Sequence, residues 1–270
     1  MRLHFQFLFL LSVFSFNCNA QIDTLALNFG TKIYLESKIG SEKIEAWMRL
    51  PSNFEEVKDS VSLLILLDGD EYFKMASDVT ELYEWCGKMK PTVIIGLPST
   101  TESRWKYFTP TNVQYEGKPN PEDSLLYSTT GNFQKFADII SKELVPILET
   151  FLKVKFEKKT IFGHSNGGLG VMNFYAFRPE IFDHYIAASP AILWDNYYLQ
   201  NHIGTAKKSN NLYMTLATGG WDYDIKSFKT IRNKIKNTNK NFKFTINNQE
   251  SHSTNGLRTL LDGLNYVNKN

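Results

Sequence analysis

The sequence predicts an α/β fold, a mainly parallel sheet flanked by helices with an antiparallel N-terminal edge. From residue 61 onward, short apolar runs alternate with longer helical patterns, which is typical of a parallel sheet built from strand–helix–strand units. The first two expected strands, 26–36 and 43–50, are joined without a helix, which predicts an antiparallel pair. About 250 residues after an apolar leader, without an internal repeat or long linker, fit one domain at 21–270.

The individual elements follow from local patterns. Residues 61–67 are almost continuously apolar, as expected for a strand buried on both faces. The helical pattern at 167–177 ends at Arg178-Pro179, because proline cannot continue a helix. Residues 242–246 alternate between apolar and polar side chains, as a strand does. Strands are expected at 26–36, 43–50, 61–67, 92–97, 158–162, 184–189, 211–217 and 242–247, and helices at 71–89, 132–152, 167–177, 224–237 and 256–267.

The most informative motif lies at 159–168, which reads Lys-Thr-Ile-Phe-Gly-His-Ser-Asn-Gly-Gly. A short apolar strand runs into Gly-x-Ser-x-Gly and then into a helix. A serine at such a turn is held in strained backbone geometry with its hydroxyl above the sheet. Gly163 and Gly167 are needed because a Cβ at either position would crowd the turn. Ser165 is therefore the candidate nucleophile, and the alternative is a glycine-rich turn with a chance serine.

A serine hydroxyl needs an adjacent base, and His252 is the candidate among five histidines. His4 lies in the leader, and His164 sits beside the nucleophile with its side chain expected to point away from it. His184 lies between the helix that follows the serine motif and the next strand, and His202 lies in a polar helical or loop segment. His252 alone is expected in a loop between the last strand and the final helix, where a triad in the order serine, acid, histidine ends.

The orienting carboxylate is expected between the serine and the histidine in the chain. The strand at 211–217 leads into Thr-Gly-Gly-Trp-Asp-Tyr-Asp, which contains two aspartates. Asp222 is the first choice and Asp224 the alternative; either residue also suits the cap of the helix that starts near Ile225. The acid would fix the imidazole tautomer and stabilise the imidazolium.

An oxyanion hole needs two backbone amides, one after the nucleophile and one after an earlier strand. Asn166 supplies the first amide. Asp70 or its neighbour Gly69 supplies the second, at the end of the strand at 61–67. The acidic cluster there also suggests a metal site, but no Cys/His spacing supports one, so no metal is expected.

The polar segment 98–131 is long for a loop in a compact domain, which favours a lid or wall of the substrate site. Arg104 is a candidate contact for an anionic or polyhydroxylated substrate, and its alternative role is to tie the loop down. Trp105 is a candidate for stacking on a catecholate, feruloyl or sugar ring. Trp194 and Trp221 follow later strands and are expected either to line the same pocket or to pack.

The first twenty residues predict a secretory signal peptide at 1–20, with Arg2, an apolar run and cleavage after Ala20. The run is too short for a stable membrane span, and a secreted or periplasmic protein is expected. Lipoprotein processing at Cys18 is the alternative, although the flanking residues fit it poorly. Cys86 would then be the single cysteine, which excludes an internal disulfide, and it is expected as a buried thiol. A net charge of +2 indicates no nucleic-acid partner.

Several motifs occur in an order that resembles a known family. They are Leu66-Leu67-Asp68-Gly69-Asp70, Val93-Ile94-Ile95-Gly96-Leu97, Arg104 with Thr109-Pro110, Phe133 and Phe136, Glu143-Leu144-Val145-Pro146, the serine motif, Ser189-Pro190 with Trp194, and Ser251-His252-Ser253. Over about 43–267 the chain resembles the esterase branch of the α/β-hydrolases that includes enterochelin (siderophore) esterases and relatives of S-formylglutathione hydrolase. The resemblance implies an α/β-hydrolase fold and cofactor-free ester hydrolysis by a Ser–His–acid mechanism.

One departure from this family concerns the acid. Many relatives have a simple Gly-x-x-Glu or Gly-x-x-Asp where this chain has Gly-Gly-Trp-Asp-Tyr-Asp, so a Ser165–His252 dyad stays open. The expected function is a secreted serine carboxylic-ester hydrolase with an acyl-enzyme on Ser165 and a siderophore ester as substrate. The alternatives are an esterase for acylated or feruloylated polysaccharide, an acyltransferase, and a non-catalytic binding protein. The expected partner is a small-molecule or oligosaccharide ester, and the sequence does not indicate an oligomeric state.

Overall fold

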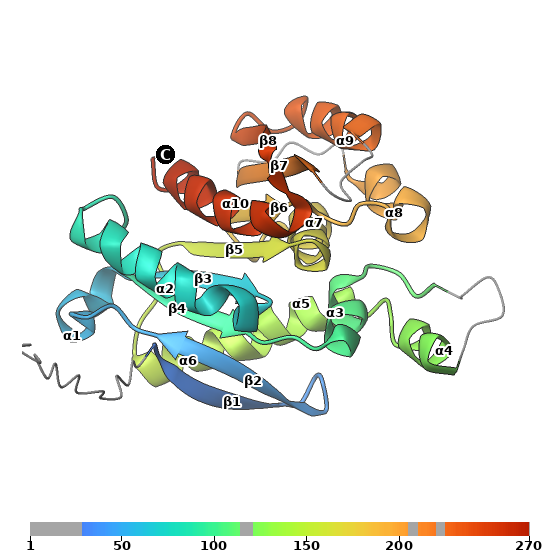
Figure 1. Ribbon diagram of the computed structural model, residues 1–270. Helices are drawn as coiled ribbons and strands as arrows, with labels where there is room; N and C mark the ends of the chain where they lie inside the picture. Colours follow the sequence, from blue (N-terminus) through green and yellow to red (C-terminus); the bar gives the residue numbers. More distant parts are fainter. Residues whose placement is uncertain (1–28, 114–120, 205–209, 220–224, 270) are drawn as a thin grey trace, which may run out of the picture.

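The computed structural model describes residues 29–113, 121–204, 210–219 and 225–269. Within this part of the chain an eight-stranded sheet has the order β1-β2-β4-β3-β5-β6-β7-β8 (Figure 1). The strands are β1 (Thr31–Ser37), β2 (Glu42–Arg49), β3 (Ser62–Leu67), β4 (Thr92–Leu97), β5 (Lys159–His164), β6 (His184–Ala188), β7 (Asn211–Gly219) and β8 (Phe242–Ser251).

The strand directions confirm the predicted sheet. β1 pairs antiparallel with β2, and β2 pairs antiparallel with β4. The remaining neighbours are parallel, with Ile65 of β3 opposite both Ile95 of β4 and Ile161 of β5. All three isoleucines are fully buried, because helices cover both faces of the parallel part of the sheet. The parallel strands therefore end at one common edge, where the loops that follow them meet.

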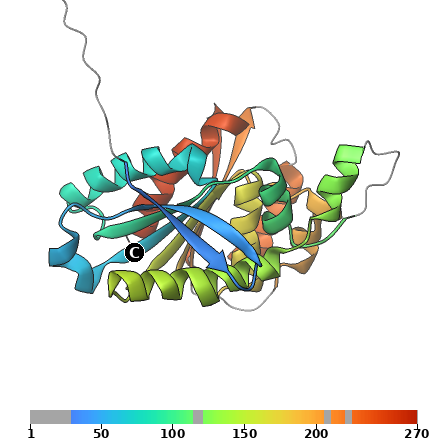
Figure 2. The same ribbon diagram turned by 90° about the horizontal axis from the view of Figure 1, so that it is seen from below.

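Helices lie on both faces of the sheet (Figures 1 and 2). They are α1 (Phe54–Val57), α2 (Gly69–Trp85), α3 (Thr101–Phe108), α4 (Pro121–Ser128), α5 (Phe133–Asp138), α6 (Val145–Leu152), α7 (Asn166–Phe177), α8 (Trp194–His202), α9 (Ile225–Lys236) and α10 (His252–Val267). On one face, α2 and α10 contribute apolar residues to a buried cluster that includes Leu64 and Leu66 of β3. On the other face, α5, α6, α7 and α9 contribute to a cluster that includes the alternate residues Leu63 and Ile65.

The helix expected at 132–152 contains a π-helical segment that the sequence did not predict. A π-helix at Ile139–Leu144 joins α5 to α6. Pro146, in the first turn of α6, has no N–H to donate to the preceding turn, which favours such a local change of hydrogen-bonding pattern. Glu143 in this segment accepts hydrogen bonds from the Lys38 amide at 2.9 Å and the Ile39 amide at 3.1 Å. The π segment thus holds the β1–β2 turn.

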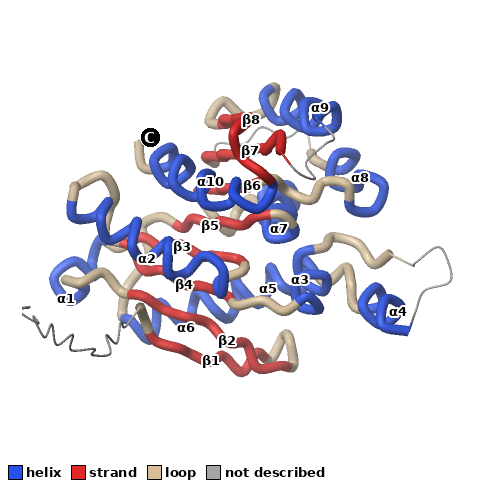
Figure 3. Tube along the Cα trace, in the orientation of Figure 1, coloured by secondary structure: helices blue, strands red, loops and turns tan. Residues whose placement is uncertain are grey.

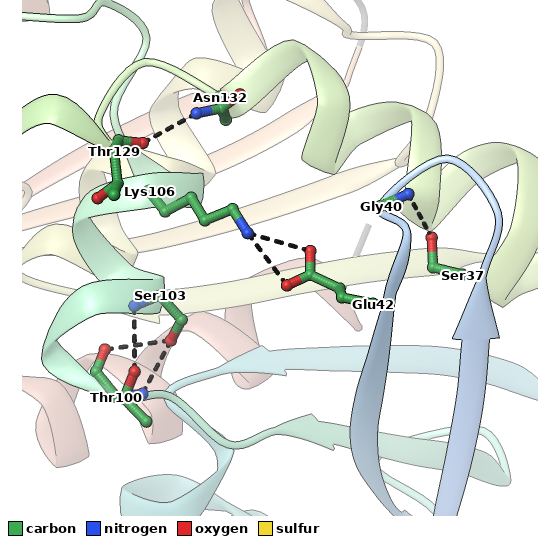
Figure 4. Close-up of polar contacts among 8 residues, drawn as sticks. All are labelled: Ser37, Gly40, Glu42, Thr100, Ser103, Lys106, Thr129 and Asn132. Atoms are coloured by element: carbon green, nitrogen blue, oxygen red, sulfur yellow. Dashed lines mark hydrogen bonds and ion pairs between the residues drawn. The ribbon is translucent and has the colours of Figure 1, made fainter.

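The segment 98–131 is not a continuous loop, contrary to expectation, because it contains α3 and α4 (Figure 3). α3 begins with a capping box, in which the Thr100 side chain accepts from the Ser103 amide at 3.1 Å. Lys106 on the same helix donates to Glu42 of β2 at 3.1 Å (Figure 4). Local caps and one ion pair therefore order a polar segment that lacks a strong apolar pattern.

Cys86 is exposed, so the prediction of a buried thiol was wrong. α2 buries Tyr72, Phe73, Ala76 and Thr80, and Cys86 follows its last residue. Trp85, the last residue of the helix, is 83% exposed. Among the described residues, no helix is both long and apolar enough to cross a membrane.

Candidate active site

Ser165 lies at the turn between β5 and α7, as the motif predicts. Its backbone has φ 58° and ψ −118°, a strained conformation that L-residues adopt only where the surroundings impose it. The Ser165 amide donates to the Ala188 carbonyl at 3.0 Å, and its carbonyl accepts from the Ala191 amide at 3.0 Å. A Cβ on Gly163 would lie 2.4 Å from the Gly167 carbonyl oxygen, so only glycine fits this turn.

Two helices begin at the same edge of the sheet as this turn. Asn166 is the first residue of α7, and Gly69 and Asp70 are the first two of α2. The first amides of a helix have no acceptor within the helix, and the helix dipole makes that end positive. Asp68 turns the chain at φ 55°, and a Cβ on Gly69 would lie 2.6 Å from the backbone of Gly96. β3 and β5 are adjacent and parallel, so both helix starts lie at the same sheet edge.

His252 also lies at this edge, but it is the first residue of α10 and not part of a loop. The last helix starts four residues earlier than predicted, because Ser251 and Thr254 form a capping box. The Ser251 side chain accepts from the Thr254 amide at 3.2 Å, and Thr254 Oγ1 accepts from the Ser251 amide at 3.0 Å. The Ser-x-x-Thr spacing at 251–254 is the sequence signal that could have predicted this helix start. A helical position holds the His252 backbone more firmly than a loop would.

A buried polar network fixes the first turn of α10. Asn255 is fully buried and donates to Ser189 Oγ at 2.7 Å and to Thr215 Oγ1 at 2.9 Å. Its oxygen accepts from Asn247 Nδ2 at 2.6 Å, and Thr215 is hydrogen-bonded to Thr259 at 2.6 Å. Buried polar groups with all their partners present select one arrangement, because breaking any bond leaves an unpaired group in the interior. The network joins α10 to β7 and β8.

His164, the residue before the candidate nucleophile, contacts the candidate base. It is 6% exposed, and its Nε2 lies 2.8 Å from the backbone carbonyl oxygen of His252. The ring centroids of the two histidines are 4.7 Å apart. Sequence analysis gave His164 no role beyond its place in the elbow, and no local pattern could have indicated this contact.

Asp68 and Arg104 form an ion pair at the start of α2. The Arg104 Nη2 donates to Asp68 Oδ2 at 3.1 Å, and Nε lies 3.0 Å from Oδ1 without hydrogen-bond alignment. Asp68 is 2% exposed, and burial raises its pKa to about 6 although Arg104 opposes this shift. A Cβ on Gly167 would lie 2.8 Å from Asp68 Oδ2, so the carboxyl group lies against the first turn of α7. Arg104 therefore ties α3 to the serine turn.

Three aromatic side chains from α3, α4 and α8 gather near Arg104. The ring centroid of Trp105 lies 5.0 Å from that of Trp194 and 5.9 Å from that of Tyr127. Trp194 also donates from Nε1 to Thr111 Oγ1 at 3.0 Å. All three rings are half-buried. We call Trp105, Tyr127 and Trp194 the aromatic cluster.

Three predicted site residues, Trp221, Asp222 and Asp224, lie outside the described residues. The side chain of Asp70, predicted only for its amide, accepts from the Ser99 amide at 3.0 Å. Across the part of the chain that the structure describes, no group of three or more His, Cys, Asp or Glu residues could hold a metal ion.

Comparison with known proteins gives three kinds of match. The sequence model of the family described as "Putative esterase" matches residues 37–256. Ferri-bacillibactin esterase BesA of Bacillus subtilis is 28% identical over 179 residues, 61% of this chain and 61% of that protein. The siderophore enterobactin esterase of Emericella nidulans is 30% identical over 149 residues, 51% of this chain and 48% of that protein. The matched part thus spans about half to three fifths of these curated relatives.

Among solved structures, an IroE-like serine hydrolase from Shewanella oneidensis has the same fold. The TM-score is 0.77 at 22% sequence identity, over 89% of this chain and 80% of that chain. The eight-stranded, mostly parallel sheet with its antiparallel N-terminal strands agrees with the fold that the sequence predicts.

Proposed function

Because the chain belongs to the "Putative esterase" family, we propose that it hydrolyses carboxylic esters through an acyl-enzyme on Ser165. The observation that carries the proposal is the strained turn at Ser165, with φ 58°, at the sheet edge where α2 and α7 begin. A folded chain keeps such a conformation only where neighbouring contacts over-determine it, and functional sites are where this usually occurs.

The proposed reaction has two stages. His252 takes the proton of the Ser165 hydroxyl, whose oxygen attacks the ester carbonyl carbon. The amides of Asn166 and of Gly69 or Asp70 stabilise the negative oxygen of the tetrahedral intermediate. The C–O bond to the alcohol breaks, and His252 protonates the departing oxygen. Water then gives a proton to His252 and attacks the acyl carbon. The bond to the Ser165 oxygen breaks, the carboxylic acid leaves, and His252 returns the proton to Ser165.

We keep Asp222 as the proposed acid, with Asp224 as the alternative and a Ser165–His252 dyad as the third arrangement. An acid that accepts a hydrogen bond from the imidazole would set its tautomer and stabilise its charged form. The capping box at Ser251 and the network at Asn255 support the dyad as well, because they hold the His252 backbone without a carboxylate.

We propose a siderophore ester as the substrate. The support is the match to two curated proteins whose names describe siderophore esterases. Arg104, which is linked to the serine turn through Asp68, and the aromatic cluster would contact an aryl or anionic group, together with Trp221. An acylated or feruloylated polysaccharide would suit the same side chains. We also propose that residues 1–20 direct export and are removed, which leaves one domain at 21–270 with 98–131 as its substrate wall.

The test is hydrolysis of a short-chain p-nitrophenyl ester by the purified protein and by Ser165→Ala, with the exposed Ser52→Ala as control. We expect Ser165→Ala to lower kcat/KM by about 1,000-fold or more and Ser52→Ala to change it little. An active Ser165→Ala protein would refute the acyl-enzyme. If the wild type is inactive on this ester, catecholate siderophore and feruloyl esters come next. Diversion of the product to a new ester by added alcohol would favour an acyltransferase, and binding without turnover would favour a binding protein.

A further inference from the structure

We infer that His164 is a positioning residue, which holds the base His252 in place through the backbone of His252. This inference rests on the proposed function, because it assigns a role within the same site. His164 ends β5 immediately before the nucleophile, so its side chain is as firmly placed as the serine turn itself. Its Nε2 lies 2.8 Å from the His252 carbonyl oxygen, across 88 residues of sequence.

The hydrogen bond has one possible direction. A carbonyl oxygen only accepts, so Nε2 of His164 must carry the hydrogen. His252 is the first residue of α10, and its carbonyl can accept both this bond and a helical amide, because a carbonyl oxygen has two lone pairs. The bond holds the backbone of His252 and leaves both nitrogens of the His252 imidazole to other partners. A positioning residue must leave the imidazole nitrogens available in this way, because the base exchanges protons through them.

The Tyr72 side chain, which comes from α2, packs beside the contact between His164 and His252. Its ring packs edge-on against the His164 ring, with centroids 6.1 Å apart, and it is 4% exposed. A Cβ on Gly256 would lie 2.1 Å from the Tyr72 hydroxyl oxygen, so α10 approaches Tyr72 as closely as glycine allows. The helix that carries the oxyanion amides, the strand that carries the serine and the helix that carries the base therefore meet at His164.

Residue 164 needs a hydrogen-bond donor, and packing alone does not replace it. An apolar side chain at residue 164 would fill the same space but remove the hydrogen bond to the His252 carbonyl oxygen. A displacement of about 1 Å in a catalytic group can lower the rate about 100-fold. The Asn255 network fixes the first turn of α10 from the other side, at Ser189 and Thr215. His164 holds the first turn of α10 on the side of Ser165.

The first experiment compares His164→Leu and His164→Gln, with the exposed His202→Leu as control. We expect His164→Leu to lower kcat about 10- to 100-fold with little change in KM, because the base is misplaced while the substrate site remains. His164→Gln keeps an N–H donor at a similar reach and should stay within about 5-fold of wild type. His202→Leu should not change the rate. Full activity of His164→Leu would overturn the inference.

A double-mutant cycle separates positioning from general stability. If His164 acts through His252, then His164→Leu should cost nothing further in a His252→Ala background. An equal loss in both backgrounds would mean that His164 acts independently of the base, and the inference would be wrong. Ester hydrolysis that is lost in Ser165→Ala but not in His164→Leu would contradict this inference and leave the proposed function intact.

A third measurement does not depend on activity. In protein labelled with nitrogen-15 at histidine, two-bond correlations to the ring protons report which ring nitrogen carries a hydrogen. The His164 signals are identified by their loss in His164→Gln. We expect Nε2 of His164 to be protonated. A hydrogen on Nδ1 alone would overturn the inference, even if the proposed esterase activity proved to be wrong for other reasons.

Discussion

Asp68→Asn tests the electrostatics of the serine turn. Burial raises the pKa of Asp68 from its usual 3.8 to about 6. A pKa gap of about 2 units corresponds to about 3 kcal/mol, at about 1.36 kcal/mol per unit. Asparagine has nearly the same shape and tolerates the φ of 55° at this position, so the substitution removes the charge with little change of backbone.

The sign of the effect follows from the direction of the shift. The folded state binds a proton on Asp68 more tightly than the unfolded state does, so this group favours folding when it is protonated. Its contribution is fully present below about pH 3.8 and is lost as the pH rises through about 6. The free energy of unfolding of Asp68→Asn, minus that of wild type, should therefore rise by about 3 kcal/mol between about pH 4 and 7.

The assay is urea unfolding of both proteins between about pH 4 and 7.5, followed by tryptophan fluorescence. The attraction of Arg104 for ionised Asp68 needs no separate correction, because the net pKa of about 6 already contains it. Other titrating groups, such as His184, whose pKa burial lowers, cancel in the comparison. A difference that stays flat across this range, or falls as the pH rises, would refute the argument that burial outweighs Arg104.

Two further predictions concern the base and its acid. Gly256→Ala should destabilise the protein by about 1–3 kcal/mol in urea unfolding, because the new Cβ would lie 2.1 Å from the Tyr72 hydroxyl oxygen, and adding Tyr72→Phe should recover part of the loss. If Tyr72→Phe recovers none of the stability lost in Gly256→Ala, the clash does not involve the Tyr72 hydroxyl. Asp222→Asn should lower turnover of a p-nitrophenyl ester far more than Asp224→Asn, by up to about 10,000-fold if the aspartate fixes the tautomer. Equal effects or the reverse order would reject Asp222 as the acid.

Much of the fold could be predicted because its signals are local. A strand buried on both faces is a short apolar run, and the run at 61–67 became β3 (Ser62–Leu67) almost residue for residue. Gly163 is required by backbone crowding within one tight turn, which the motif states directly, whereas a Cβ on Gly167 would meet the Asp68 side chain. The antiparallel start of the sheet followed from a connection too short for a helix.

The errors in prediction occurred where local signals were weak. α3 and α4 lie in a polar segment whose apolar periodicity is poor, so caps such as Thr100 and Ser103 define α3 more than hydrophobicity does. Cys86 has apolar neighbours in sequence, but it follows the last residue of α2 and is exposed. The start of α10 at His252 depends on a Ser–Thr capping box, which is a less obvious signal than the usual Ser–Glu pair.

The sequence by itself determined the Gly-x-Ser-x-Gly turn and the strands, because each depends on the chemistry of a few consecutive residues. It indicated His252 as the candidate base by chain order and elimination. Only the tertiary structure decided which side chains hold that site together. The contacts between His164 and the His252 carbonyl, and between Asp68 and Arg104, join residues 88 and 36 positions apart. They exist because β3 and β5 lie side by side and β8 ends at the same sheet edge, and strand order is a property of the whole packed sheet.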